Sequence, residues 1–208
     1  MSDRRLNPIS DAELERRWKA ARAMMHERGI DALIMQNNND WLGGYVKWFT
    51  DFPAYNGYPR TVIFHLNDAM TVVDMGPAGS RRGFEGKHAI HRGVGDLITT
   101  PAFTSIAYTD GYQGELALGE LKRRAYKRIG ILGRGAMPYR FVTQIEQGLA
   151  GTTEIVDATE EIGILHDQQR RVIVNLGQGV GDSGTRILIT DNLDIQTLHI
   201  GAQHCPVL

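Results

Sequence analysis

The first forty residues follow the pattern of an amphipathic helix that leads into a strand. Apolar residues recur every three or four positions, at Leu14, Trp18, Ala21 and Met25. Such spacing places them on one helix face. The word from Ser10 to Glu13 reads S-x-x-E, a capping box in which each side chain satisfies a free helix amide. Gly29 is typical of a helix end. We therefore expect a capped helix that packs its apolar face on other elements.

Further along, short apolar runs alternate with helical patterns. The runs predict strands at 31–36, 60–65, 70–74, 127–132 and 153–156, and the helical patterns lie at 41–49, 115–126 and 137–149. The second and third runs are separated by a short polar turn, which indicates a hairpin. The glycine-rich stretch 76–95 is predicted to be a long surface loop. Together these elements predict an α/β fold with a mixed β-sheet flanked by helices.

Composition narrows the possible functions. Lys and Arg (23) nearly balance Asp and Glu (24), which argues against a nucleic-acid-binding protein, since such a protein carries a basic stripe. The chain holds one cysteine, Cys205, which fits a reducing compartment. Its start has no apolar signal segment, and no apolar run is long enough to span a membrane. We expect a soluble, cytoplasmic protein.

Several segments, in this order, are similar to the N-terminal domain of creatinases, prolidases and aminopeptidases P. These are the helix end and strand ERGIDALIM, the word WLGGY, the hairpin TVIFHLNDAMTVVDMG, the strand RIGILG and the closing TTEIVDATEEI. Each segment alone is weak, whereas their order and spacing together are specific. The resemblance runs from about Ser10 to Glu161 and implies a ribonuclease-H-like fold.

The resemblance also implies where the chemistry of such enzymes takes place. In this family the N-terminal domain assists dimerisation and reaches over the active site of the neighbouring subunit. Catalysis belongs to a following domain, where two aspartates, a histidine and two glutamates hold two divalent metal ions. Residues 162–208 contain no glutamate. We therefore expect no catalytic residue, metal site or cofactor in this chain.

A loop before the hairpin is the predicted site. Creatinases place there an aromatic residue and, two positions later, an arginine that holds the substrate carboxylate of the partner subunit. Tyr55 falls at the aromatic position, but Gly57 stands where the arginine would be, and Arg60 lies at another offset, so creatine hydrolysis is not favoured. Phe52, Tyr55 and Tyr58 are expected to be exposed, because exposed aromatics anchor interfaces. With Arg60 they are predicted to gate substrate or contact a partner.

The composition changes after Glu161. Residues 1–161 hold ten glutamates and five lysines, and residues 162–208 hold neither. We therefore divide the chain into a domain at 1–161 and a divergent tail at 162–208. The tail is either a separate small β-like piece or the product of truncation or a shifted reading frame, and the abrupt departure favours the second.

Three other motifs have simpler interpretations. Asp182 begins the aspartic-protease-like word DSGT, but a glycine-rich turn explains it better. Gly133 and Gly135, between a strand and a helix, are candidates for phosphate binding, although a plain turn is favoured. His88 and His91 have metal-ligand spacing but lie in a loop with few other ligands.

The sequence thus predicts a non-catalytic dimerisation and substrate-gating domain of an Xaa-Pro peptidase-like metallohydrolase. Its partner would be a second copy or a separately encoded catalytic domain. Two alternatives stay open: a module that binds a small molecule or peptide through the Phe52–Arg60 loop, and a hydrolase that uses Asp182 in the tail.

Overall fold

The structure is a computed structural model that describes residues 9–37, 44–52, 59–84, 90–101, 106–165, 186–188 and 196–198. Its helices are α1 (Asp11–Arg28), α2 (Gly44–Thr50), α3 (Ile106–Arg124), the 3-10 turn η1 (Arg134–Ala136) and α4 (Tyr139–Leu149), and residues 159–165 are also helical. Its strands are β1 (Ala32–Asn37), β2 (Arg60–His65), β3 (Met70–Met75), β4 (Arg81–Gly83), β5 (Val94–Thr100), β6 (Arg128–Leu132), β7 (Glu154–Asp157), β8 (Arg186–Leu188) and β9 (Gln196–Leu198).

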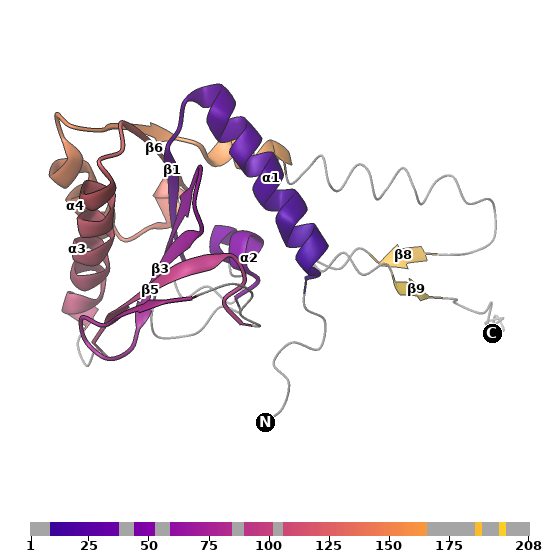
Figure 1. The fold of residues 1–208 in the computed structure, drawn as a ribbon, viewed down its shortest axis with the longest axis horizontal. Helices are drawn as coiled ribbons and strands as arrows, with labels where there is room; N and C mark the ends of the chain where they lie inside the picture. Colours follow the sequence, from indigo (N-terminus) through magenta and orange to yellow (C-terminus); the bar gives the residue numbers. More distant parts are fainter. Residues whose placement is uncertain are drawn as a thin grey trace, which may run out of the picture.

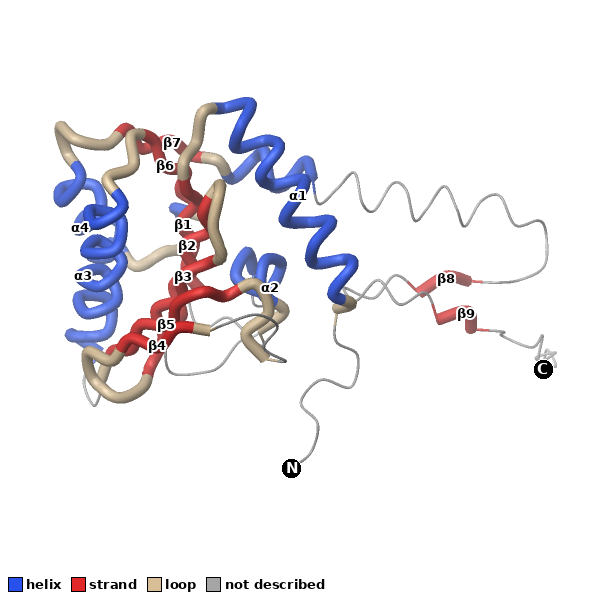
Figure 2. The backbone as a smooth tube through the Cα atoms, viewed as in Figure 1, coloured by secondary structure: helices blue, strands red, loops and turns tan. Residues whose placement is uncertain are grey.

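A seven-stranded mixed sheet forms the centre of the domain, in the order β4-β5-β3-β2-β1-β6-β7 (Figures 1 and 2). β1 pairs antiparallel with β2 and parallel with β6, and β3 pairs antiparallel with β2 and parallel with β5. The predicted hairpin is confirmed by β2 and β3, in which Thr61 lies opposite Val73. The predicted fold class, a mixed sheet flanked by helices, is also confirmed.

Helices cover both faces of the sheet, so the domain has two hydrophobic cores. α1 and α2 lie on one face and α3 and α4 on the other (Figure 1). Strand residues divide between the two cores by alternation: Leu33 and Met35 face α1 and α2, whereas Ala32 and Ile34 face α3 and α4. Because both faces are covered, the central strands carry apolar side chains on both sides, as buried strands do.

The helix α1 forms where the sequence predicts it. The Ser10 hydroxyl accepts a hydrogen bond from the Glu13 amide at 3.2 Å, and Gly29 ends the helix in the left-handed conformation, with φ 64°. Leu14 is fully buried. The indole Nε1 of Trp18 donates to the Phe49 carbonyl at 2.7 Å. This bond ties α1 to the end of α2.

The predicted loop at 76–95 is partly wrong. It contains β4 and the first residues of β5, and β5 is a seven-residue strand paired with β3. The glycines of this stretch permit close packing. A Cβ on Gly93 would lie 2.5 Å from the Trp18 ring, and one on Gly95 would lie 3.0 Å from the Ala69 side chain. Gly93 ends the turn before β5 with φ 72°, and Gly95 within β5 lets the strand approach its neighbour closely.

Helix α3 begins at Ile106, well before the predicted start at 115. Gly111 and Gly114 obscured its first turns, because glycine lowers helix propensity. Both glycines face α4: a Cβ on Gly111 would lie 3.1 Å from the Arg140 guanidinium, and one on Gly114 would lie 2.2 Å from the Gln144 amide. The two helices therefore pack backbone to side chain with little space between them.

The boundary predicted at 161 stays a prediction, although Ile162 is buried in the core beneath α1 and α2. In the tail, β8 pairs antiparallel with β9. None of the described helices combines the length and apolar character that a bilayer crossing requires.

Candidate functional site

Of the four predicted site residues, the structure describes Phe52 and Arg60, while Tyr55 and Tyr58 lie outside the described residues. The prediction that Phe52 is exposed is wrong, because only 3% of it is accessible. Its ring lies 4.6 Å from the Arg60 guanidinium and 5.3 Å from the His91 ring. Phe52 lies two residues after the end of α2 and packs into the core. Its role in gating or at an interface stays a prediction.

Arg60 opens β2 and is held by Asp74 at the end of β3. Its Nε and Nη2 lie 2.7 Å and 2.6 Å from the Asp74 Oδ2, and only 13% of the arginine side chain is exposed. The guanidinium therefore lies between a carboxylate and the Phe52 ring, where both favour its positive charge. This arrangement fixes the point at which the chain leaves the 53–58 segment.

Asp51 holds the other end of the same segment. It is buried and has a left-handed backbone, with φ 58°. Asp tolerates this conformation better than most residues. Its Oδ2 accepts hydrogen bonds from the Ile9 amide at 3.1 Å and from Arg92 Nη2 at 2.7 Å. Arg92 also bonds to Asp11 at 2.9 Å. The start of α1, the end of α2 and the turn before β5 therefore meet at Asp51.

On the opposite face of the sheet, a buried chain of hydrogen bonds holds the start of β2. Gln113 Nε2 donates to the Pro59 carbonyl at 3.0 Å, so its Oε1 accepts from the Thr61 hydroxyl at 2.8 Å. Thr61 in turn accepts from Gln36 Nε2 at 3.1 Å. Because a carbonyl cannot donate, this direction is fixed along the whole chain. Within the described residues, Gln36 Oε1 is left without a partner.

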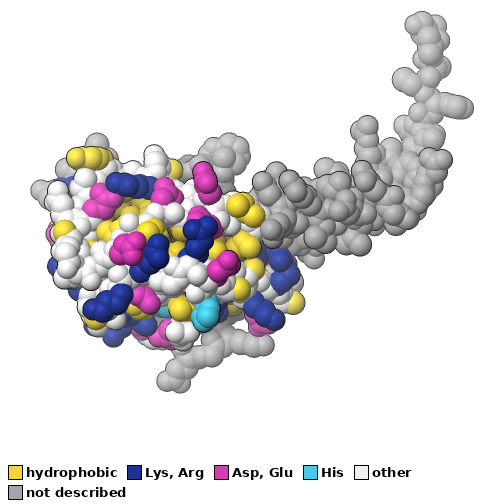
Figure 3. Space-filling view, turned by 90° about the horizontal axis from the view of Figure 1, so that it is seen from above, with side chains coloured by type: hydrophobic (Ala, Val, Ile, Leu, Met, Phe, Trp, Pro, Cys, Tyr) yellow, Lys and Arg dark blue, Asp and Glu magenta, His cyan; other side chains and the backbone are white. Residues whose placement is uncertain are grey.

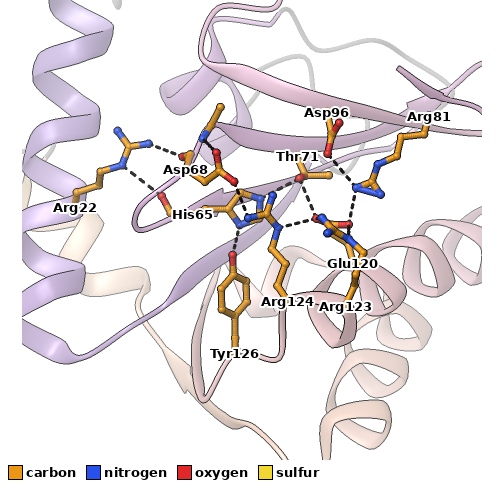
Figure 4. A network of polar contacts seen from close by, with 11 residues as sticks. Arg22, His65, Asp68, Thr71, Arg81, Asp96, Glu120, Arg123, Arg124 and Tyr126 are labelled. Carbon is orange, nitrogen blue, oxygen red and sulfur yellow. Dashed lines mark hydrogen bonds and ion pairs between the residues drawn. The ribbon is translucent and has the colours of Figure 1, made fainter. Parts of the chain in front are cut away.

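A second polar cluster lies where α3 meets the β2–β3 hairpin and β4 (Figure 4), and Glu120 is its centre. The Glu120 side chain is 0% exposed and binds three guanidiniums: Arg81 at 2.6 Å, Arg123 at 2.7 Å and Arg124 at 2.8 Å. Burial alone would raise the pKa of Glu120, but the hydrogen bonds from Arg123 and Arg124 and the charge of Arg81 outweigh it. The pKa is lowered to about 2. Glu120 is thus charged at neutral pH.

His65 lies beside this cluster and is buried. Its Nε2 is 2.9 Å from the Thr71 hydroxyl and its Nδ1 is 2.8 Å from the Tyr126 hydroxyl. Burial, aided by the charge of Arg124, lowers the pKa of His65 to about 4. Burial raises the pKa of Tyr126, so a protonated hydroxyl faces a neutral imidazole. A catalytic base must be able to reach its substrate, and His65 is only 1% exposed, so we assign the cluster a structural role.

The remaining sequence candidates are not assembled into a site. The Gly133 amide donates to the Thr159 hydroxyl at 2.9 Å, so it does not point at a phosphate. His91 stacks on Phe84 at 4.6 Å. His88 and Asp182 lie outside the described residues. In the parts of the chain that the structure describes, no three potential metal ligands come together.

Glu120, Gln113, Asp51 and Arg92 were not predicted. A signal for Glu120 was present, since Arg123 and Arg124 follow it at the helical spacings of three and four residues. Burial of that glutamate depends on the sheet, which local spacing does not reveal. Viewed from above (Figure 3), basic and acidic side chains are interspersed around a hydrophobic band.

The sequence and the fold are both similar to those of known proteins. Residues 17–172 match the Creatinase/Prolidase N-terminal domain family. A prolidase from Thermococcus sibiricus is similar with a TM-score of 0.50 and 11% identity, over 75% of this chain and 37% of that one. The N-terminal domain of the cytoplasmic peptidase PepQ from Mycobacterium tuberculosis is similar with a TM-score of 0.48 and 13% identity, over 72% of this chain and 98% of that one. A proline dipeptidase from Streptococcus pneumoniae is similar with a TM-score of 0.47 and 10% identity, over 75% of this chain and 97% of that one. No curated protein matches the chain.

Proposed function

The chain belongs to the creatinase/prolidase N-terminal domain family, and from this premise we propose that it is the non-catalytic domain of an Xaa-Pro peptidase-like metallohydrolase. In this role it pairs with a second subunit and, where that subunit carries a catalytic domain, reaches over its active site. Its partner is a second copy of the chain or a separately encoded catalytic domain. The family match supports this proposal.

The observation that carries the proposal is the anchoring of the 53–58 segment at both ends. Asp51, which precedes these positions, is held by Arg92, and Arg60, which follows them, is held by Asp74. The sequence between these anchors includes two aromatic residues, Tyr55 and Tyr58. Functional residues are often carried on loops that a rigid scaffold positions. Aromatic residues that lie in the sequence between two anchored positions are suited to contact a partner or its substrate.

Sedimentation velocity at several concentrations tests the pairing. We expect a concentration-dependent dimer that Tyr55→Ser or Tyr58→Ser shifts towards monomer, with the melting temperature changed by only a few degrees, about what 0.5 kcal/mol produces. Phe52→Ser is unsuitable here because Phe52 is buried. Tyr139→Ser is the matched control, since Tyr139 is 84% exposed on α4. If every protein sediments as a monomer, or if the control dissociates the dimer equally, the pairing proposal is wrong.

We also propose that the chain alone hydrolyses no peptide and acts in the cytoplasm. The absence of glutamate from residues 162–208 supports the first part, because paired divalent ions need several carboxylates. The similarity to PepQ, which is a cytoplasmic peptidase, supports action in the cytoplasm. Hydrolysis of a proline-containing dipeptide by the purified chain with Mn²⁺, at a rate proportional to protein concentration, would contradict the first part.

A further inference from the structure

Two turns of the chain meet at the ring of Phe52. This ring lies edge-on to the His91 ring at 5.3 Å, and His91 in turn stacks on Phe84 at 4.6 Å, with 15° between the ring planes. Phe52 directly precedes the 53–58 segment, whereas His91 lies in the turn before β5. The ring contacts therefore hold this turn beside the start of the 53–58 segment.

An ion pair between the neighbouring residues supports the same contact. Arg92 Nη2 lies 2.7 Å from Asp51 Oδ2, and the two side chains are only 14% and 6% exposed. Arg92 Nη1 also lies 2.9 Å from Asp11 Oδ1 at the start of α1. Two consecutive residues on each side thus take part, so the turn is fixed in orientation as well as in position.

Ile90 is the exposed residue of this turn. It is 56% exposed, although isoleucine is among the residues most often buried. A single exposed apolar side chain is ordinary on a protein surface, so exposure alone decides nothing. The position of Ile90 is what matters, because it directly precedes His91 and therefore lies beside the start of the segment that includes Tyr55 and Tyr58.

The charges of this region allow two copies of the chain to meet through it. Residues 53–58 and 89–90 include no charged residue, and Arg92 is paired with Asp51 and Asp11. A two-fold axis sets a surface against its own image. A contact built from aromatic and aliphatic residues gains from this arrangement, because apolar area leaves water without like charges being opposed.

We propose that Ile90 is an anchor of the pairing between two copies of this chain. The contact runs from the 53–58 segment to the turn before β5, and the ring contacts and the ion pair of Arg92 hold that turn in place. This inference rests on the proposed pairing, commits it to a second copy of the chain, and adds to it a residue and a region.

Sedimentation velocity over a range of concentrations compares Ile90→Ser with Ile164→Ser. Ile164 is the matched control, because it is 57% exposed and lies near Glu161, which pairs with Arg28 at the opposite end of α1 from Asp11. We expect Ile90→Ser to raise the dimer dissociation constant about tenfold or more, since the two-fold axis removes the side chain twice. Ile164→Ser should change it less than about twofold. If Ile90→Ser fails to fold, Ile90→Thr keeps the β-branched shape and should act in the same direction.

The outcomes separate this inference from the proposed pairing. A dimer that Tyr55→Ser dissociates and Ile90→Ser leaves intact would overturn the inference while the pairing stands. Equal weakening by Ile90→Ser and Ile164→Ser would also overturn it, because the dimer would then respond to any loss of exposed apolar surface. A wild-type chain that stays monomeric at every concentration would contradict the pairing itself and the inference with it.

Discussion

The two faces of the sheet hold ion pairs of different construction. On the α1/α2 face, Arg60 pairs with Asp74 and Arg92 with Asp51, and each pair fixes one end of a loop. On the α3/α4 face, one carboxylate serves three guanidiniums. Loss of Arg60 leaves Asp74 without its guanidinium, and Arg92 serves two carboxylates, Asp51 and Asp11, whereas the cluster has three arginines on a single carboxylate. The first arrangement therefore depends on its arginines, and the second depends mainly on Glu120.

The largest effect is expected from the apolar residue beneath the Arg60 pair. Phe52→Ala should lower the free energy of unfolding by about 3–5 kcal/mol, because it leaves a cavity in the core. Urea denaturation measures the change. Tyr139→Ala, an exposed aromatic change of the same size, should stay within about 0.5 kcal/mol. Similar small losses for both variants would mean that Phe52 is exposed.

The next effect concerns pH on the α3/α4 face. The folded pKa of His65, about 4, lies below its ordinary value of 6.5, so the unfolded chain binds more protons between these values. Stability is therefore full above pH 6.5 and falls by about 3 kcal/mol as the pH drops from 6.5 to 4. Denaturation at several pH values measures this.

A variant assigns that slope to one residue. His65→Gln should be less stable at pH 7 but should lose less stability between pH 6.5 and 4, because the buried titrating group is gone. Exposed His26 provides the control, and His26→Gln should leave the slope unchanged. A slope that survives in His65→Gln would refute the assignment.

A smaller loss is expected when the shared carboxylate loses its charge. Glu120→Gln should reduce stability by about 2 kcal/mol, less than for a fully buried pair, because the three arginines are partly exposed and can be hydrated. Glu115→Gln, on the exposed face of the same helix, is the control. The loss should vanish below about pH 2, where Glu120 itself is protonated. An equal effect of both variants would place Glu120 at the surface.

The smallest effect separates the two constructions directly. Arg60→Met should cost about 1 kcal/mol, because it leaves Asp74 without its guanidinium. Arg123→Met should cost about 0.5 kcal/mol or less, since Arg81 and Arg124 still hold Glu120. The difference between the two denaturation midpoints is the measurement. A larger loss for Arg123→Met would mean that the cluster is not redundant.

Local signals were sufficient for the capped helix, the hairpin and the strands β1, β2, β3, β6 and β7. They failed where glycine had a packing role: Gly93 and Gly95 concealed β5, and Gly111 concealed the start of α3. They also failed for side chains whose burial depends on distant segments. Nothing near Phe52 shows that His91 and Arg60 will enclose its ring, and nothing near Asp51 shows that Arg92 will reach it.

The edge strand β4 limits how two copies can associate. All three of its residues are exposed, and two of them are Arg81 and Arg82. A two-fold axis pairs each surface with its own image. Joining two sheets through β4 would therefore set arginines of one copy against arginines of the other, and like charges directly opposite each other destabilise strand pairing. Symmetry and charge together thus direct any pairing of subunits away from this edge.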